Sequence, residues 1–98
     1  MLHELFKIIE ERKSNPTRNS YTNQLLSSKE DLILKKIGEE AMEVVLAAKG
    51  QGKQRIVEEV ADLFYHTLVL LSSQDLALAD VEAELRQRHQ TSHEARKI

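Results

Sequence analysis

The chain has 98 residues, no cysteine and a formal net charge of -2. This length allows one small domain, and the missing thiols exclude disulfides, thiolate metal sites and a cysteine nucleophile. The small net charge gives no general attraction to nucleic acid or an anionic membrane, and no apolar run approaches the roughly 20 residues that span a bilayer, so we expect a cytoplasmic protein with a single domain over residues 1–98.

Helix-forming residues dominate, with one proline and three glycines in the whole chain, so we expect an all-α bundle of four to five helices. The first helix is expected over residues 2–13, ending by Ser14 because the residue before Pro16 is pushed out of helical geometry. Its apolar residues recur at helical spacing. Those expected to face inward are Leu2, Leu5, Phe6, Ile8 and Ile9.

A loop-like run from Ser14 to Ser20 follows the first helix. We then expect a short helical turn over residues 23–26, with Thr22 as its N-cap, because a threonine hydroxyl can accept a hydrogen bond from the first free backbone N–H groups.

Two long helices are expected over about residues 29–49 and 53–73. The sequence Gly50-Gln51-Gly52 separates them, since glycine tolerates the backbone conformations that end a helix. A last helix is expected from Leu78 to about His89, and residues 90–98 are expected to fray.

The segment Leu68–Leu71 is apolar almost all round the second long helix. A helix that is apolar on every side must be covered on every side, and a chain of this size gains stability by association. We therefore expect a homodimer.

Each long helix carries an acidic cluster: Glu39-Glu40-Ala41-Met42-Glu43 in the first and Glu58-Glu59-Val60-Ala61-Asp62 in the second. Residues three apart share a helix face, so Glu40 pairs with Glu43 and Glu59 with Asp62. Each pair lies beside an arc of apolar residues on its own helix. The angular offset between the acids and the arc is the same in both helices. The expected arcs are Ile33, Leu34, Ile37, Ala41, Val44, Val45 and Ala48, and Ile56, Val60, Leu63, Phe64, Thr67, Leu70 and Leu71.

If the two arcs pack as an antiparallel pair, the four carboxylates meet at the rim of the seam. Such a group raises its own pKa values unless a cation lies among them, and oxygen ligands suit a hard divalent ion, Mg²⁺. One such pair alone usually marks a solvated face. The repetition at matching angles favours a site formed by Glu40, Glu43, Glu59 and Asp62, which Glu39 could reach from the flank.

His66 lies one turn after Asp62. It could orient a carboxylate, bind phosphate or act as an acid, and it could equally be a histidine at the edge of the core. Lys36 and Arg55 lie one turn before Glu40 and Glu59. Each suits either a surface ion pair or a phosphate-rich ligand.

The acidic signature resembles that of the MazG-like all-α nucleotide pyrophosphohydrolases, and within them the phosphoribosyl-ATP pyrophosphatase family. The resemblance covers about residues 2–90. It is carried by Ser20-Tyr21-Thr22, by Lys35-Lys36-Ile37-Gly38-Glu39-Glu40 and by Asp62-Leu63-Phe64-Tyr65-His66. The chain departs from the family at Ser27–Glu30, where a glycine is common, and in its tail.

This resemblance implies a homodimer that hydrolyses phosphoribosyl-ATP to phosphoribosyl-AMP and pyrophosphate with Mg²⁺. Glu39, Glu40, Glu43, Glu59 and Asp62 would be catalytic, the last four as metal ligands. The substrate-binding residues would be Arg12, Lys13, Ser20, Tyr21, Thr22, Lys36 and His66. The alternatives are a pyrophosphatase for another nucleotide and a non-catalytic helical dimerisation module.

Overall fold

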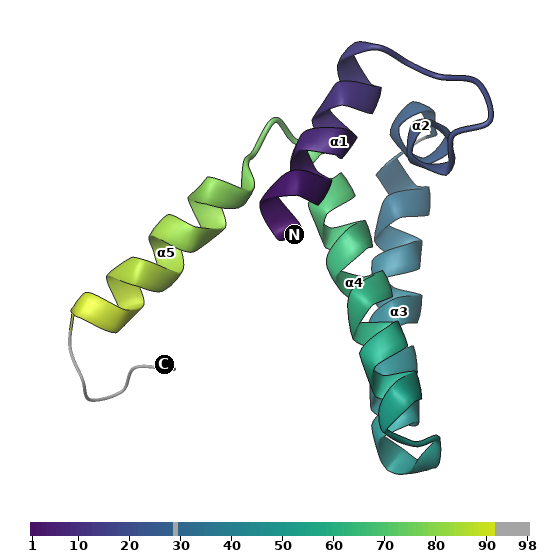
Figure 1. The fold of residues 1–98 in the computed structure, drawn as a ribbon, viewed down its shortest axis with the longest axis vertical. Helices are drawn as coiled ribbons and strands as arrows, with labels where there is room; N and C mark the ends of the chain where they lie inside the picture. Colours follow the sequence, from purple (N-terminus) through teal and green to yellow (C-terminus); the bar gives the residue numbers. More distant parts are fainter. Residues whose placement is uncertain (29, 92–98) are drawn as a thin grey trace.

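The computed structural model describes residues 1–28 and 30–91, and this part of the chain folds into five α-helices without a strand (Figure 1). The expected all-α fold is thus confirmed. The expected helix start at Lys29 and most of the tail expected to fray, residues 92–98, lie outside the described residues. The helices are α1 (Leu2–Ser14), α2 (Tyr21–Ser27), α3 (Glu30–Gly50), α4 (Lys53–Ser73) and α5 (Leu78–Gln90).

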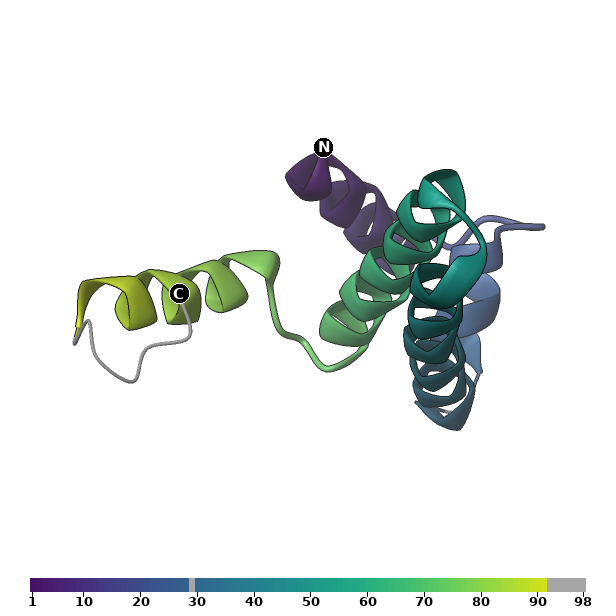
Figure 2. The ribbon, with the colours of Figure 1, turned by 90° about the horizontal axis from the view of Figure 1, so that it is seen from below.

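Helices α3 and α4 form a long antiparallel hairpin, which is the body of the molecule (Figure 1). Helix α1 lies against the second half of α4, and the short α2 packs on α1, α3 and α4 at the open end of the hairpin. Helix α5 projects away from the hairpin in both views (Figure 2).

The hairpin turns at Gly52, whose φ of 93° is a conformation that side chains with a Cβ rarely adopt. At the start of α2 the expected cap is corrected. Ser20, not Thr22, is the N-cap, and its hydroxyl accepts a hydrogen bond from the backbone N–H of Asn23. The helix therefore begins two residues earlier than expected, and the side chain of Thr22 is left for a tertiary contact.

The core lies where α1, α2, α3 and α4 meet, and its buried residues are Ile9, Leu25, Ile33, Leu68 and Val69. Leu5 and Phe6 pack against it from α1, as expected. The inward assignment of Leu2 and Ile8 is wrong for the single chain, because their exposed fractions are 40% and 46%. Ile9 alone is fully buried on this helix, since α1 touches α4 along one narrow stripe.

The two long helices are rotated relative to the expectation. The stripe of α3 that turns inward is Ile33, Ile37, Glu40, Val44 and Ala47, whereas Leu34, Ala41, Val45 and Ala48 are exposed. On α4 the deeply buried residues are Glu59, His66, Leu68, Val69 and Ser72, and Phe64 is 48% exposed. Glu40 and Glu59 therefore lie in the seam of the hairpin, Asp62 is exposed at its edge, and part of each expected arc faces outward.

The reason given for a partner chain at Leu68–Leu71 is also corrected. Leu68 and Val69 are buried within the single chain, and Leu70 and Leu71 are half-buried. The single chain is nevertheless open elsewhere: its accessible surface is 7164 Å², against about 5,700 Å² for a compact monomer of its mass. None of the described helices combines the length and apolar character needed to cross a membrane.

Candidate functional site

Three carboxylates converge between the two long helices. Glu40 of α3 and Glu59 and Asp62 of α4 each contribute one oxygen, and these oxygens all lie within 4.8 Å of one another. We call these three residues the acidic group. Its members come from both helices because Glu40 belongs to the inward stripe of α3 and faces the buried turn of α4 that carries Glu59.

Glu59 is the most deeply buried member, with 5% of its surface exposed. Arg55, one turn earlier on α4, places one guanidinium nitrogen 2.5 Å from Glu59 Oε1 and the other terminal nitrogen 2.7 Å from Glu58 Oε1. A buried carboxylate is stable only when it is paired or bound. Arg55 therefore supplies the positive charge that Glu59 requires, while Glu58 remains on the surface.

The charges around Glu40 are mostly negative, whereas Glu59 has the positive charge of Arg55 beside it. Burial raises the pKa of the Glu40 carboxyl above its usual value, and a hydrogen-bonding contact with Glu59 and the charges of Asp62 and Glu59 raise it further. Only His66 acts in the other direction among the causes resolved for this group. The acidic group thus carries more negative charge than its protein surroundings compensate, which is the condition that a bound cation relieves.

The other acids of the first cluster lie outside this convergence. Glu43 is half-buried but is not a member of the acidic group, although it is near enough to raise the pKa of Arg55. Glu39 is exposed, and its carboxylate lies 3.8 Å from the ammonium of Lys36. Lys36 therefore faces Glu39 in this structure and not Glu40.

Tyr21, Thr22 and His66, all expected to bind substrate, are engaged with one another and with Tyr65. The hydroxyl of Tyr21 lies 3.0 Å from His66 Nε2, and Thr22 Oγ1 lies 2.5 Å from the hydroxyl of Tyr65. The tyrosine rings stack with centroids 6.1 Å apart. His66 is 6% exposed, and its Nδ1 bonds the backbone carbonyl of Asp62 and not the carboxylate.

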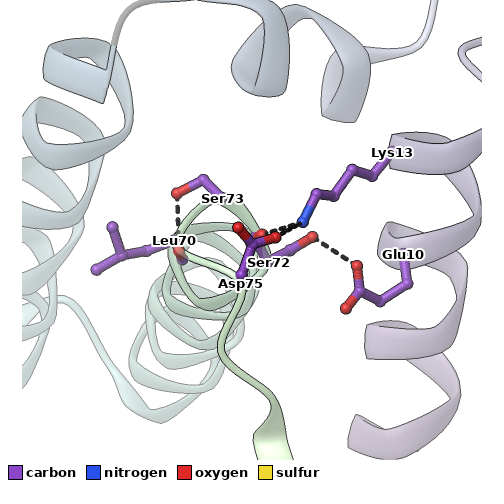
Figure 3. Close-up of polar contacts among 6 residues, drawn as sticks. All are labelled: Glu10, Lys13, Leu70, Ser72, Ser73 and Asp75. Atoms are coloured by element: carbon purple, nitrogen blue, oxygen red, sulfur yellow. Dashed lines mark hydrogen bonds and ion pairs between the residues drawn. The ribbon is translucent and has the colours of Figure 1, made fainter.

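Lys13, in the last turn of α1, lies beside the C-terminal end of α4 (Figure 3). Its ammonium donates hydrogen bonds to the carbonyl oxygen of Ser72, at 2.7 Å, and to Asp75 Oδ1, at 2.6 Å. Beside it, the buried hydroxyl of Ser72 donates to Glu10 Oε2 at 2.9 Å. The neighbouring Arg12 contributes its backbone carbonyl, which accepts a hydrogen bond from the side chain of Asn23.

Two contributors were missed in the sequence. The ion pair of Arg55 with Glu59 follows from their i,i+4 spacing, but the sequence did not indicate that Glu59 is buried and the pair therefore not on the surface. Tyr65 lies within the Asp62–His66 segment that carries the resemblance, but its contacts with Thr22 and Tyr21 depend on where α2 packs and could not be predicted locally.

Carboxylate oxygens are the ligands of hard divalent cations, and Mg²⁺ in nucleotide sites is commonly held by one or two carboxylates together with substrate phosphates. The acidic group fits such an ion in donor type, in spacing and in its uncompensated charge. The described part of the chain shows three polar features around it: Arg55, the half-buried Glu43 and the Tyr21–His66 contact.

Comparison with known proteins gives one consistent result. Residues 2–89 match the family model described as phosphoribosyl-ATP pyrophosphohydrolase. A phosphoribosyl-ATP pyrophosphatase of Bacillus mycoides (strain KBAB4) is 52% identical over 91% of this chain and 83% of its own. The protein of that name from Clostridium acetobutylicum is 46% identical over 92% of this chain and 82% of its own.

A longer relative shows the same match. The histidine biosynthesis bifunctional protein HisIE of Gloeobacter violaceus is 54% identical over 89% of this chain, which corresponds to 39% of that protein.

Proposed function

This chain belongs to the phosphoribosyl-ATP pyrophosphohydrolase family, and we propose that it is the hydrolase that converts phosphoribosyl-ATP to phosphoribosyl-AMP and pyrophosphate in histidine biosynthesis. The resemblance carried by its sequence motifs is thereby confirmed. Relatives about half identical over most of the chain bear the name of this enzyme, and another is named as a bifunctional protein of histidine biosynthesis.

The observation that carries the proposed chemistry is the convergence of Glu40, Glu59 and Asp62 from two helices. We propose that these three residues hold Mg²⁺. Glu43, one turn along α3 from Glu40, would complete the ligand set, and Glu39 would assist from the flank. A bound Mg²⁺ would neutralise phosphate oxygens and make the attacking water more acidic.

The residues of the chain would do the remaining work. One carboxylate of the set would take the proton of the attacking water, which requires a group whose pKa lies near the working pH. Which carboxylate of the set takes this proton is decided by comparing the activities of the Glu→Gln and Asp→Asn variants of its members. Arg55 supplies a counter-charge to the buried Glu59 through the contact at 2.5 Å.

Cations near the site would hold the phosphates. Among the described residues, the ion pair of Lys36 is with an exposed acid at 3.8 Å, and exchanging such a contact for phosphate costs little. The guanidinium of Arg12 would approach from α1. Lys13 would have to leave both Ser72 and Asp75 to join them, so we propose that it stabilises the end of α4. Ser20, Tyr21 and Thr22 would lie nearest the ribosyl or base end of the nucleotide.

We further propose that the working unit is a homodimer. A hollow of about 710 Å³ lies between the start of α1, α4 and α5 and is mostly apolar, with Leu63, Phe64, Leu71, Leu78, Val81 and Leu85 in its lining. Exposed apolar side chains also follow α3 at Leu34, Met42 and Val45. Together with the surface in excess of a compact monomer, these faces suit a second copy of the chain.

The decisive experiment measures pyrophosphate release from phosphoribosyl-ATP and from a panel of nucleoside triphosphates, with and without Mg²⁺. Preferential hydrolysis of phosphoribosyl-ATP that requires Mg²⁺ supports the proposal. Preference for another nucleotide would assign the chain to a different pyrophosphatase activity of the same fold. A Glu40→Gln variant should lose activity by about 100-fold or more with its helix content intact, whereas Glu84→Gln on α5 should behave like the parent.

A further inference from the structure

The imidazole of His66 connects two helices through its two nitrogens. The side chain lies on α4 and is 6% exposed. Nδ1 lies 2.8 Å from the backbone carbonyl oxygen of Asp62 and Nε2 lies 3.0 Å from the hydroxyl of Tyr21 on α2. One side chain therefore touches both a residue of the acidic group and the first residue of the helix that covers the open end of the hairpin.

The contact with Asp62 determines which nitrogen carries the proton. A carbonyl oxygen only accepts hydrogen bonds, so Nδ1 must donate. In the neutral imidazole Nε2 is then an acceptor, and the hydroxyl of Tyr21 must donate to it. Both partners are thus specified, which leaves His66 no free nitrogen with which to bind a phosphate or transfer a proton.

Neighbouring contacts hold Tyr21 in the orientation that this bond needs. Its ring stacks on Tyr65 at an interplanar angle of 24° and meets the His66 ring edge-on with centroids 5.8 Å apart. Thr22, the next residue of α2, bonds the hydroxyl of Tyr65. The first turn of α2 is therefore attached to two consecutive residues of α4, one turn beyond Asp62.

We infer that His66 is a positioning residue: its imidazole, with Nδ1 on the backbone carbonyl of Asp62 and Nε2 on the hydroxyl of Tyr21, aligns α2 with the acidic group. This inference rests on the proposed function, in which Ser20, Tyr21 and Thr22 lie at the ribosyl or base end of the nucleotide. His66 then sets the distance between the part of the site that holds the metal and phosphates and the part that holds the rest of the substrate.

A positioning role and a merely structural role differ in kinetics. Loss of the Tyr21–His66 bond shifts α2 but leaves the three carboxylates in place, so we expect the KM for phosphoribosyl-ATP to rise while kcat changes little. The expected rise is about tenfold, the equivalent of one net hydrogen bond. A merely structural role would lower the midpoint of thermal unfolding and leave KM unchanged.

The experiment is a double-variant cycle with Tyr21→Phe, His66→Leu and the double variant, measuring KM, kcat and the thermal shift caused by Mg²⁺. We expect each single variant to raise KM and the double variant to be no worse than the more severe single one, because both remove the same bond. The Mg²⁺ shift should persist throughout. Multiplicative effects of Tyr21→Phe and His66→Leu on KM, or an unchanged KM in Tyr21→Phe, would overturn the inference.

Tyr65→Phe is the matched control, since it removes a phenol hydroxyl from the same ring cluster and leaves the Tyr21–His66 bond intact. In a double variant of Tyr65→Phe and His66→Leu, the fold-changes in KM of the two single variants should multiply. A His66→Gln variant, whose amide oxygen can accept from Tyr21, should recover part of the lost affinity, and no recovery would contradict the role of the acceptor.

Long-range ¹H–¹⁵N spectra of His66 in the intact protein, recorded where the imidazole is neutral, test the geometry without substrate. We expect protonated Nδ1 and unprotonated Nε2, and the reverse tautomer would refute the inference. If the parent protein fails to hydrolyse phosphoribosyl-ATP, the proposed function fails. The tautomer and the coupling of Tyr21→Phe with His66→Leu in thermal unfolding then still decide whether His66 links the two helices.

Discussion

The guanidinium of Arg55 lies 2.5 Å from the carboxylate of Glu59, the most buried acid of the site. The same guanidinium also contacts Glu58 on the surface, so Arg55 bridges the edge of the seam. A cation bound by the acidic group would share Glu59 with Arg55. The pair would therefore stabilise the protein without metal and compete with the metal for one ligand.

We predict that Arg55→Gln lowers the midpoint of thermal unfolding in the absence of Mg²⁺, because Glu59 is left buried without its counter-charge. The same variant should bind Mg²⁺ more tightly and show a larger thermal shift with it than the parent. Arg88→Gln is the matched control, since Arg88 pairs with Glu84 at the same i,i+4 spacing on exposed α5. A weaker Mg²⁺ shift in Arg55→Gln would mean that Arg55 orients Glu59 and does not compete.

The thermal shift caused by Mg²⁺ should increase with pH. The pKa of Glu40 is raised in the folded protein, so the proton on this carboxyl stabilises the fold at low pH, and that stabilisation is lost as the pH rises through the folded pKa. Mg²⁺ must displace the same proton. Differential scanning fluorimetry between about pH 5 and about pH 7.5 should therefore show a growing shift for the parent.

In Glu40→Gln the thermal shift should be smaller and nearly independent of pH over this range. Without Mg²⁺ at neutral pH, this variant should be at least as stable as the parent, since it removes a charge that its neighbours repel. An equal, strongly pH-dependent shift in both proteins would exclude Glu40 from the metal site.

The helices themselves followed from local signals that the sequence displays. Pro16 ends α1, the Gly50–Gly52 turn separates the long helices, and α4 has the expected bounds of Lys53–Ser73. Such signals act within a few residues and do not depend on where the other helices pack. Helix type and length could therefore be predicted well.

The rotation of α3 and α4 about their axes could not be predicted in the same way. The apolar pattern alone places Leu34, Val45 and Phe64 inside, yet these residues are exposed and the seam contains Glu40 and Glu59. An acid on an inward stripe contradicts the rule that apolar residues face the core, as is expected at a functional site. The exposed parts of the apolar arcs belong to the surface that the proposed homodimer would cover.

The candidate site was predictable in its acids and less so in its surroundings. The i,i+3 spacing identified Glu40, Glu59 and Asp62, which the structure brings together. Lys13 contacts Ser72, which is 59 positions away in the chain, and His66 contacts Tyr21, which is 45 positions away. No local pattern encodes such distant contacts.

We predict that Lys13→Met lowers the midpoint of thermal unfolding at neutral pH, because it removes bonds to the carbonyl of Ser72 and to Asp75. Lys13 lowers the pKa of Asp75. This contribution is present above the unfolded pKa of the carboxyl and is lost as the pH falls through its folded pKa. The difference between parent and variant should thus narrow in acid, as measured by circular dichroism melts over a pH series.

Asp75→Asn serves as the control for charge alone. Asp75 has a φ of 58°, which asparagine also tolerates, so the backbone at the end of α4 is preserved. This variant should show a smaller loss than Lys13→Met, since the bond from Lys13 to Ser72 remains. A Lys13→Met variant as stable as the parent at every pH would show that the contact contributes nothing.

A backbone prediction concerns the hairpin turn. Gly52→Ala should lower the free energy of unfolding by about 1–3 kcal/mol, because Gly52 has a φ of 93° and the strain of an added Cβ is conformational. Apart from the adjacent residues and the local helix backbone, no atom of the described residues lies within 4 Å of an added Cβ at Gly52 or Gly50. Gly50→Ala, in an ordinary helical conformation, should be neutral or stabilising by up to about 1 kcal/mol. Urea titration of both variants separates strain from crowding.

The proposed homodimer predicts that one exposed aromatic residue is essential for assembly and dispensable for folding. Phe64 lines the apolar hollow and is 48% exposed in the single chain, so Phe64→Glu should retain its helix content while sedimentation equilibrium shows monomers. Leu46→Glu, on α3 outside the hollow and 44% exposed, is the comparison: a dimer in this variant confines the interface to the hollow, and loss of the dimer here too extends it to α3. The opposite pattern, a dimeric Phe64→Glu and a monomeric Leu46→Glu, would move the interface to the other face of the hairpin. If the parent protein is monomeric at every concentration, no second copy covers the apolar hollow. The dimer proposal then fails.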